Sequence, residues 1–267
     1  MNSTTTSSTV RSSAATRPSA RSGADTDART QRLPIHGAWP FWGAAAGVLG
    51  AVGHLLTMPT LSEAEYLQGP AYMEQLDRGG FHVGIVAGMA AVFCLLFFAA
   101  GWRRLLHQGE QGGGGGSLAA AVVPLALTAS AGAMLLGYGF KGSLAIYLPG
   151  GSDAGTMPYD GLYSLFMFND LGPYMAWWGV AMAGIAIAWL ALRERALPLW
   201  FGVVSVLFAL PPIGMLLVTG LPGFPGVVHP LWLLITGVGM GILGLRARNG
   251  AEAPVASVAS VASLAVE

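Results

Sequence analysis

The sequence predicts an all-α, polytopic membrane protein, built as a six-transmembrane-helix bundle with a short interfacial helix on the outer side and disordered tails. Three observations predict this class. Of the 267 residues, 54% are hydrophobic and only 10% are charged, whereas roughly a quarter are charged in an ordinary soluble domain. The apolar residues form blocks of about 20, the length that crosses a hydrocarbon core of about 30 Å. Arginines gather in alternate connections between these blocks, a pattern typical of multi-pass membrane proteins.

The two ends of the chain differ in composition from the part between them. Residues 1–36 are rich in Ser, Thr, Ala and Arg, so they cannot bury enough apolar surface to offset the entropy lost on ordering. The C-terminal residues repeat the triplet Val-Ala-Ser, a low-complexity pattern. We therefore expect a disordered tail over 1–36, a transmembrane domain over 37–247 and a flexible tail over 248–267.

Six apolar blocks are expected to cross the membrane as helices. Their predicted bounds are 38–58, 81–102, 117–140, 172–192, 197–218 and 227–245. Three of the blocks open with a Pro-x-Trp tripeptide, in which proline suits the first helical turn and tryptophan suits the membrane interface. The three tripeptides begin at Pro40, Pro198 and Pro230.

Small residues and prolines inside the blocks predict how the helices pack. Gly43 with Gly47, and Gly179 with Ala183, form small-xxx-small pairs that allow close approach of two backbones in a lipid environment. Pro211-Pro212 in the fifth block removes backbone hydrogen bonds and predicts a kink.

The charge pattern predicts the orientation in the cell membrane. If both termini are cytoplasmic, eleven of the thirteen cations lie on the inner side, and only Arg78 and Lys141 lie outside. This satisfies the positive-inside rule at every connection. The outer connections then carry seven acids against two cations, a net charge of −5, so we expect an acidic outer face.

Composition also excludes several classes of protein. The formal net charge is zero, which gives no reason to expect a nucleic-acid partner. The single cysteine, Cys94, excludes an internal disulfide and a thiolate metal cluster. Only one of the thirteen cations is a lysine, a bias that we interpret as GC-rich coding and hence a bacterial source.

Three histidines are predicted at one level of the membrane, and they are the main candidates for a site. His54, His82 and His229 each lie near the outer end of a predicted span, and histidine is both a common metal ligand and the side chain that titrates near neutral pH. They either face headgroup water separately or converge as acid, base or metal ligands. The carboxylate most suited to join them is Asp160, which is flanked by tyrosines in the long outer connection.

The outer connections predict two short helices and one helix cap. Thr60-x-x-Glu63 and Ser62-x-x-Glu65 both match a capping box for a helix over 62–68. The second outer connection, 141–171, has apolar residues at helical spacing over 157–170, which predicts an interfacial helix or a lid. Asp170 is expected to cap the fourth span.

Three functions stay open. The first is an accessory or binding protein whose acidic, histidine-containing outer face binds a lipid, an ion, an apolar small molecule or a membrane partner. The second is a membrane-embedded enzyme acting on a lipid or isoprenoid-like apolar substrate, with His54, His82, His229 and Asp160 as catalytic groups. The third is a transporter, which the absence of an ionisable residue near mid-membrane disfavours. The sequence leaves the cofactor and the metal unknown, since it carries no recognisable binding motif for either.

Overall fold

The computed structural model describes residues 33, 35–55, 58, 61–111, 117–221 and 224–252. Within these ranges every regular element is a helix and there is no strand, as the sequence predicts. In chain order the helices are α1 (Phe41–His54), α2 (Glu63–Tyr66), the 3-10 helix η1 (Gly69–Glu74), α3 (Arg78–Gln111), α4 (Leu118–Tyr147), α5 (Tyr159–Ala176), α6 (Trp178–Leu192), α7 (Leu199–Thr219) and α8 (Pro225–Glu252). Most of the tail predicted over 1–36 lies outside the described residues.

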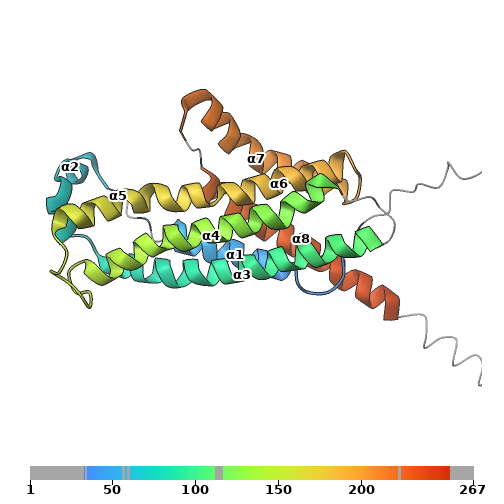
Figure 1. Cartoon of the computed structure of the whole chain (residues 1–267), viewed down its shortest axis with the longest axis horizontal. Coiled ribbons are helices and arrows are strands. Elements are labelled where there is room, and N and C mark those ends of the chain that lie inside the picture. The colour runs from blue at the N-terminus through green and yellow to red at the C-terminus, as the bar shows by residue number, and fades with distance from the viewer. Residues whose placement is uncertain are drawn as a thin grey trace, which may run out of the picture.

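The long helices form a bundle along one axis. α3, α4 and the α5–α6 pair run side by side, with α1 and α8 behind them (Figure 1). Gly43 of α1 faces the Phe98 ring of α3, whereas a Cβ atom on Gly53 would lie 2.8 Å from the backbone nitrogen of Gly88. The contacts thus run in opposite directions along the two helices, so α1 and α3 are antiparallel.

Four described helices are long and apolar enough to cross a membrane. These spans are Arg78–Gln108, Leu118–Tyr147, Leu199–Thr219 and Pro225–Arg248. The other two predicted spans correspond to shorter helices, because α1 has 14 residues and α6 has 15. At 1.5 Å per residue, 15 residues reach only about 22 Å, less than the hydrocarbon thickness. The structure therefore supports a membrane protein with several spans, and the count of six stays a prediction.

α5 and α6 lie almost in line, because only Trp177 separates them (Figure 1). The predicted fourth span, 172–192, is thus preceded by a helix that already begins at Tyr159. The expectation that Asp170 caps the start of this span is wrong, since residue 170 lies inside α5.

Lys141 is the largest departure from the predicted topology. We expected it in the outer connection 141–171, but α4 continues through it to Tyr147, and the connection is shortened to 148–158. The lysine is only 1% exposed. The helix ends just before Pro149-Gly150, because a proline and a glycine stop a helix and a single charge does not.

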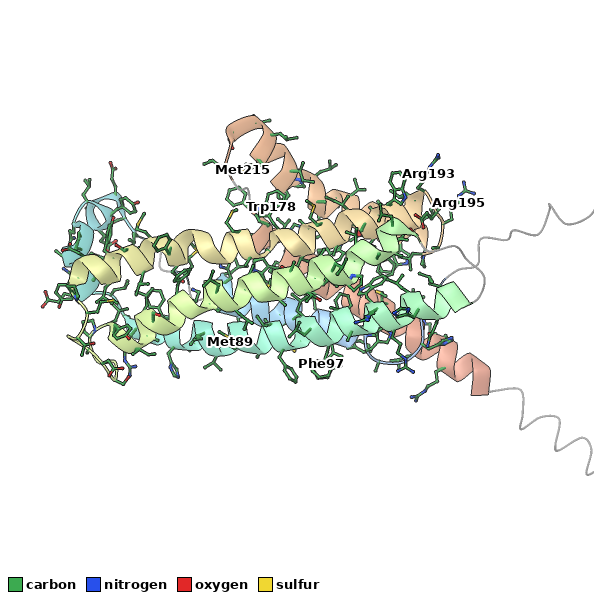
Figure 2. The ribbon with its side chains drawn as sticks, in the orientation of Figure 1. Met89, Phe97, Trp178, Arg193, Arg195 and Met215 are labelled. Carbon is green, nitrogen blue, oxygen red and sulfur yellow. The ribbon has the colours of Figure 1, made fainter. Side chains whose placement is uncertain are left out.

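Six of the seven described arginines gather at one end of the bundle, which we call the arginine end, and Arg78 lies at the opposite end. The Leu33 N–H donates to the Ala196 carbonyl over 3.0 Å, and Gly101 packs against the Trp39 ring. These contacts hold the start of α1, the end of α3 and the α6–α7 connection together, and Figure 2 labels Arg193 and Arg195 there. The described arginines in these segments and at the end of α8 are Arg103, Arg104, Arg193, Arg195, Arg246 and Arg248.

The opposite end, which we call the loop end, holds α2, η1 and the connection 148–158. A separate cluster of buried apolar side chains lies there, and we call it the apolar cap. It consists of Met73, Leu76, Phe81, Leu144, Ala145, Leu148, Leu162 and Phe166. The capping box predicted for Ser62 and Glu65 is confirmed in α2, whereas Thr60 lies outside the described residues.

The predicted glycine seams are confirmed. A Cβ atom on Gly47 would clash with the backbone of α8 at the Pro230 carbonyl, and one on Gly179 would clash with the Ala126 carbonyl of α4. Pro230 itself lies inside α8 and not at its start, so the third Pro-x-Trp tripeptide does not begin a helix. The second half of α7, after Pro211-Pro212, turns away from the other helices (Figure 1).

Candidate functional site

The four predicted site residues lie at two kinds of position. His54 ends α1 and His229 lies near the start of α8, and each is 1% exposed. His82 in the second turn of α3 and Asp160 in the first turn of α5 are exposed. His54 and His229 are therefore buried inside the bundle, whereas His82 and Asp160 lie on its surface.

His229 has a defined hydrogen bond within α8. Its Nδ1 lies 3.0 Å from the Pro225 carbonyl oxygen. A carbonyl can only accept, so this contact requires a proton on Nδ1 and leaves Nε2 as the second functional atom of the ring when the ring is neutral.

His54 contacts α8 through a glycine. A Cβ atom on Gly226 would lie 2.8 Å from His54 Nε2 and 3.3 Å from Trp177 Cδ1. Gly226 and His229 are three residues apart in one helix and therefore share a face. The two buried histidines thus lie within about one helical turn of each other.

Lys141 joins this group from α4. Its ammonium nitrogen lies 5.6 Å from the centroid of the Phe81 ring, a cation–π distance, and its charge acts electrostatically on His54. The nearby stretch of α3 contains Gly84 and Gly88, and these small residues leave room for α1 and α4 to approach on either side.

Asn169 places an amide at the level of Lys141. The rings of Phe140 and Phe168 are stacked, with centroids 5.7 Å apart, and Lys141 and Asn169 are the next residues along their two helices. Asn169 is 3% exposed, and its Oδ1 has no hydrogen-bond partner. A buried amide oxygen without a partner is uncommon, because desolvation is then uncompensated.

Tyr138 and Trp177 complete the group. The two side chains lie together, yet neither the Tyr138 hydroxyl nor the Trp177 indole nitrogen has a well-aligned hydrogen-bond partner. The Tyr138 ring occupies the space next to Gly88, and the Trp177 ring lies against Gly50 and Gly226. Both polar atoms are therefore enclosed by helices.

We call these six residues the polar core. They come from four helices and the α5–α6 junction, and they are His54, Tyr138, Lys141, Asn169, Trp177 and His229. Gly142 of α4 lies against Ile85 of α3. Lys141, the residue before Gly142, is therefore at about the height of Ile85 along the bundle. The α3 stretch from Ile85 to Arg103 covers about 27 Å. The polar core thus lies nearly one hydrocarbon thickness from the arginine end, and the apolar cap lies beyond it.

The chemistry of the polar core favours oxygen acceptors. Lys141, Tyr138 and Trp177 supply an ammonium, a hydroxyl and an indole N–H as donors. Among the described residues there is no group of three or more His, Cys, Asp or Glu side chains that could hold a metal ion. A carboxylate or carbonyl group of a small molecule fits these donors better than a metal does.

Fold and site together define a helical membrane protein with a buried, donor-rich polar core. Comparison of the chain with protein-family models, with curated proteins and with solved structures found no match. The function is therefore inferred from the site alone.

The sequence interpretation missed four members of the polar core, Tyr138, Lys141, Asn169 and Trp177. A usable signal existed for Lys141, because the residues from Ser143 to Leu148 contain no proline or glycine and the next proline is Pro149. No comparable signal existed for Asn169 or Trp177, since which face of α5 is buried depends on where α4 packs.

Proposed function

We propose that this chain is a six-span protein of the bacterial cell membrane with both termini in the cytoplasm. The four long apolar helices support this, as does the shorter apolar helix α6. The sixth segment is α1, whose 14 residues are mostly Gly, Ala, Val and Leu. The arginine end is the cytoplasmic end in this proposal, because arginines are retained on that side. An even number of spans returns the chain to the end where it started.

The opposite end is then the outer face, and it is acidic. The described acids that are exposed there are Glu63, Glu74, Asp77, Asp153 and Asp160. His82 is exposed on the same part of α3. This face suits contact with solvent or a partner, and it lies directly above the polar core.

Within this topology the protein acts as a non-catalytic binding protein. Its polar core holds the oxygen-bearing head of a small apolar molecule, and the surrounding helices contact the remainder. The observation that carries this proposal is the set of buried polar atoms on Asn169, Tyr138 and Trp177 that have no well-aligned hydrogen-bond partner. Buried donors and acceptors of this kind are normally satisfied by water or by a ligand.

Binding is favoured over the other two functions for separate reasons. Catalysis by all four predicted groups requires them in one place, and His82 and Asp160 are exposed while His54 and His229 are buried. Transport requires a polar route to the arginine end, and most of the buried side chains in that half are apolar, among them Leu95, Phe98 and Leu127.

The topology is tested with single introduced cysteines. Cys94, the only native cysteine, is buried, so the unmodified protein serves as the background control. Ser152→Cys at the loop end and Leu118→Cys at the arginine end both replace exposed residues and leave the arginines in place. A membrane-impermeant maleimide should label Ser152→Cys in intact cells and Leu118→Cys only after permeabilisation. The reverse result would contradict the proposed orientation.

The binding site is tested with palmitate as the carboxylate probe and hexadecanol as its uncharged counterpart. Lys141→Met should weaken palmitate binding by about tenfold, the value of a lost charge-assisted hydrogen bond, as measured by native mass spectrometry in detergent. Ser143→Ala is the matched control, because its hydroxyl bonds to the Gly139 carbonyl of its own helix over 3.2 Å. Asn169→Leu is the second variant in case Lys141→Met does not fold. Equal binding of palmitate and hexadecanol, or unchanged binding by both variants, would refute the proposal.

A further inference from the structure

The arginine end contains a cavity that the proposed function does not use. It has a volume of about 380 Å³ and lies between the segment before α1 and the last turns of the apolar part of α3. Its lining includes His36, Trp39, Gly101, Arg104, Leu105 and Gln108. The lining therefore combines apolar residues with three polar side chains, those of His36, Arg104 and Gln108.

The polar side chains of this cavity suit a phosphate group. The Arg104 guanidinium offers several N–H donors and a fixed positive charge, and His36 and Gln108 offer further donors. The lining contains no acidic side chain that would repel an anion. Basic pockets between membrane helices on the cytoplasmic side bind the head groups of anionic lipids.

An apolar stripe on α3 leads from the cavity along the bundle. Phe93, Phe97, Gly101 and Arg104 are spaced by four, four and three residues, so they lie on one face of the helix. Phe93 and Phe97 are 55% and 47% exposed, and Figure 2 shows Phe97 pointing away from the bundle. The Trp42 ring stacks on Phe97, with centroids 5.1 Å apart, which widens this apolar surface.

We propose that the cavity at the arginine end, together with the Phe93–Phe97 stripe, is a specific site for an anionic phospholipid. The phosphate of the head group binds Arg104, with His36 and Gln108 as additional donors, and one acyl chain lies along Phe97 and Phe93. The stripe distinguishes a lipid from free phosphate, because only a lipid gains from apolar contacts that continue toward the hydrocarbon. The inference does not depend on the ligand of the polar core, which lies nearly one hydrocarbon thickness away.

The test compares two neighbouring arginines. Arg103 and Arg104 are both exposed, but only Arg104 lines the cavity, so Arg103→Gln is a control with the same change of charge. Titration of the full chain in detergent with palmitoyl-oleoyl phosphatidylglycerol, followed by native mass spectrometry, gives the dissociation constant of each variant. Arg104→Gln should weaken binding about tenfold, and Arg103→Gln by less than about twofold, because an isolated surface charge contributes little. Phosphatidylcholine, which carries no net charge, should bind more weakly than phosphatidylglycerol to the unmodified protein.

Two further variants and one competitor keep the outcome decisive. Gln108→Glu adds a negative charge at an exposed position and should also weaken phosphatidylglycerol binding if Arg104→Gln fails to fold. Phe97→Ala should weaken lipid binding, and millimolar inorganic phosphate should not displace the lipid. Equal effects of Arg104→Gln and Arg103→Gln would mean that the lipid responds only to the overall surface charge, and this would overturn the proposal. Displacement by phosphate with no effect of Phe97→Ala would assign the cavity to free phosphate and also overturn it.

Discussion

The Ser130 hydroxyl of α4 donates a hydrogen bond to the main-chain carbonyl of Ala176, the last residue of α5. Helical hydrogen bonding is interrupted at this point, because α5 ends at Ala176 and α6 begins at Trp178. Ser130 and Ala176 are each 1% exposed, so bulk water cannot replace the bond. A side chain of one helix thus stabilises a break in its neighbour, at the edge of the polar core.

Ser130→Ala should destabilise the protein. The substitution leaves the Ala176 carbonyl buried without this donor, which costs about 1–3 kcal/mol of unfolding free energy. Unfolding in mixed detergent micelles with increasing dodecyl sulfate measures the change. The control is Ser143→Ala, whose hydroxyl bonds only within α4. If both substitutions have the same effect, the interhelical bond does not contribute specifically.

Gly47→Ala should separate α1 from α8. The added methyl group would clash with the Pro230 carbonyl, which is backbone and cannot move aside as a flexible side chain can. Such overpacking costs about 1–3 kcal/mol. Gly132→Ala is the matched control, because a Cβ atom there has no neighbour within 4 Å, and it should be neutral or stabilising by up to about 1 kcal/mol through helix propensity. A loss of unfolding free energy in Gly132→Ala as large as in Gly47→Ala would contradict the packing argument.

Ser205→Ala should loosen the contact between α7 and α8. The Trp232 indole N–H donates to the Ser205 hydroxyl over 3.1 Å, and both residues are buried. Removing the acceptor leaves the N–H unsatisfied, at a cost of about 1–3 kcal/mol. The same micelle unfolding assay measures it, with Thr128→Ala as the exposed control, since Thr128 bonds only to the Pro124 carbonyl. An unchanged unfolding free energy for Ser205→Ala would show that Trp232 finds another acceptor.

The capping box of α2 should make the loop end sensitive to acid. Hydrogen bonds from the Ser62 hydroxyl and the Ser62 N–H hold the pKa of Glu65 below its ordinary value of 4.5. Because this pKa is lowered in the folded state, its stabilisation is present above pH 4.5 and is lost as the pH falls through the folded pKa. A carboxyl-carbon NMR titration should give a lower midpoint for Glu65 in the unmodified protein than in Ser62→Ala. Identical midpoints would exclude the capping box as the cause.

The apolar blocks were predictable from composition because their physical basis is local. A run of about 20 apolar residues must be helical in a bilayer, since no water is present to satisfy its backbone groups. The Ser62–Glu65 box and the Gly47 seam were also predictable, because the sequence pattern of each lies within a few neighbouring residues, although Gly47 makes its contact with another helix. Lys141 was misplaced because a charged residue was treated as the end of a span, whereas the neighbouring helices enclose it in α4.

Composition alone shows that this chain is helical and rich in apolar spans, and the order of the residues places most of the arginines in alternate connections. The sequence did not determine which polar side chains share an interior. The packing of the helices was needed to show that His54, His229, Lys141 and Asn169 are buried while His82 and Asp160 remain exposed. Hydropathy and charge act along the chain, whereas the level and rotation of a helix depend on its contacts with neighbouring helices, such as those at Gly47 and Gly179.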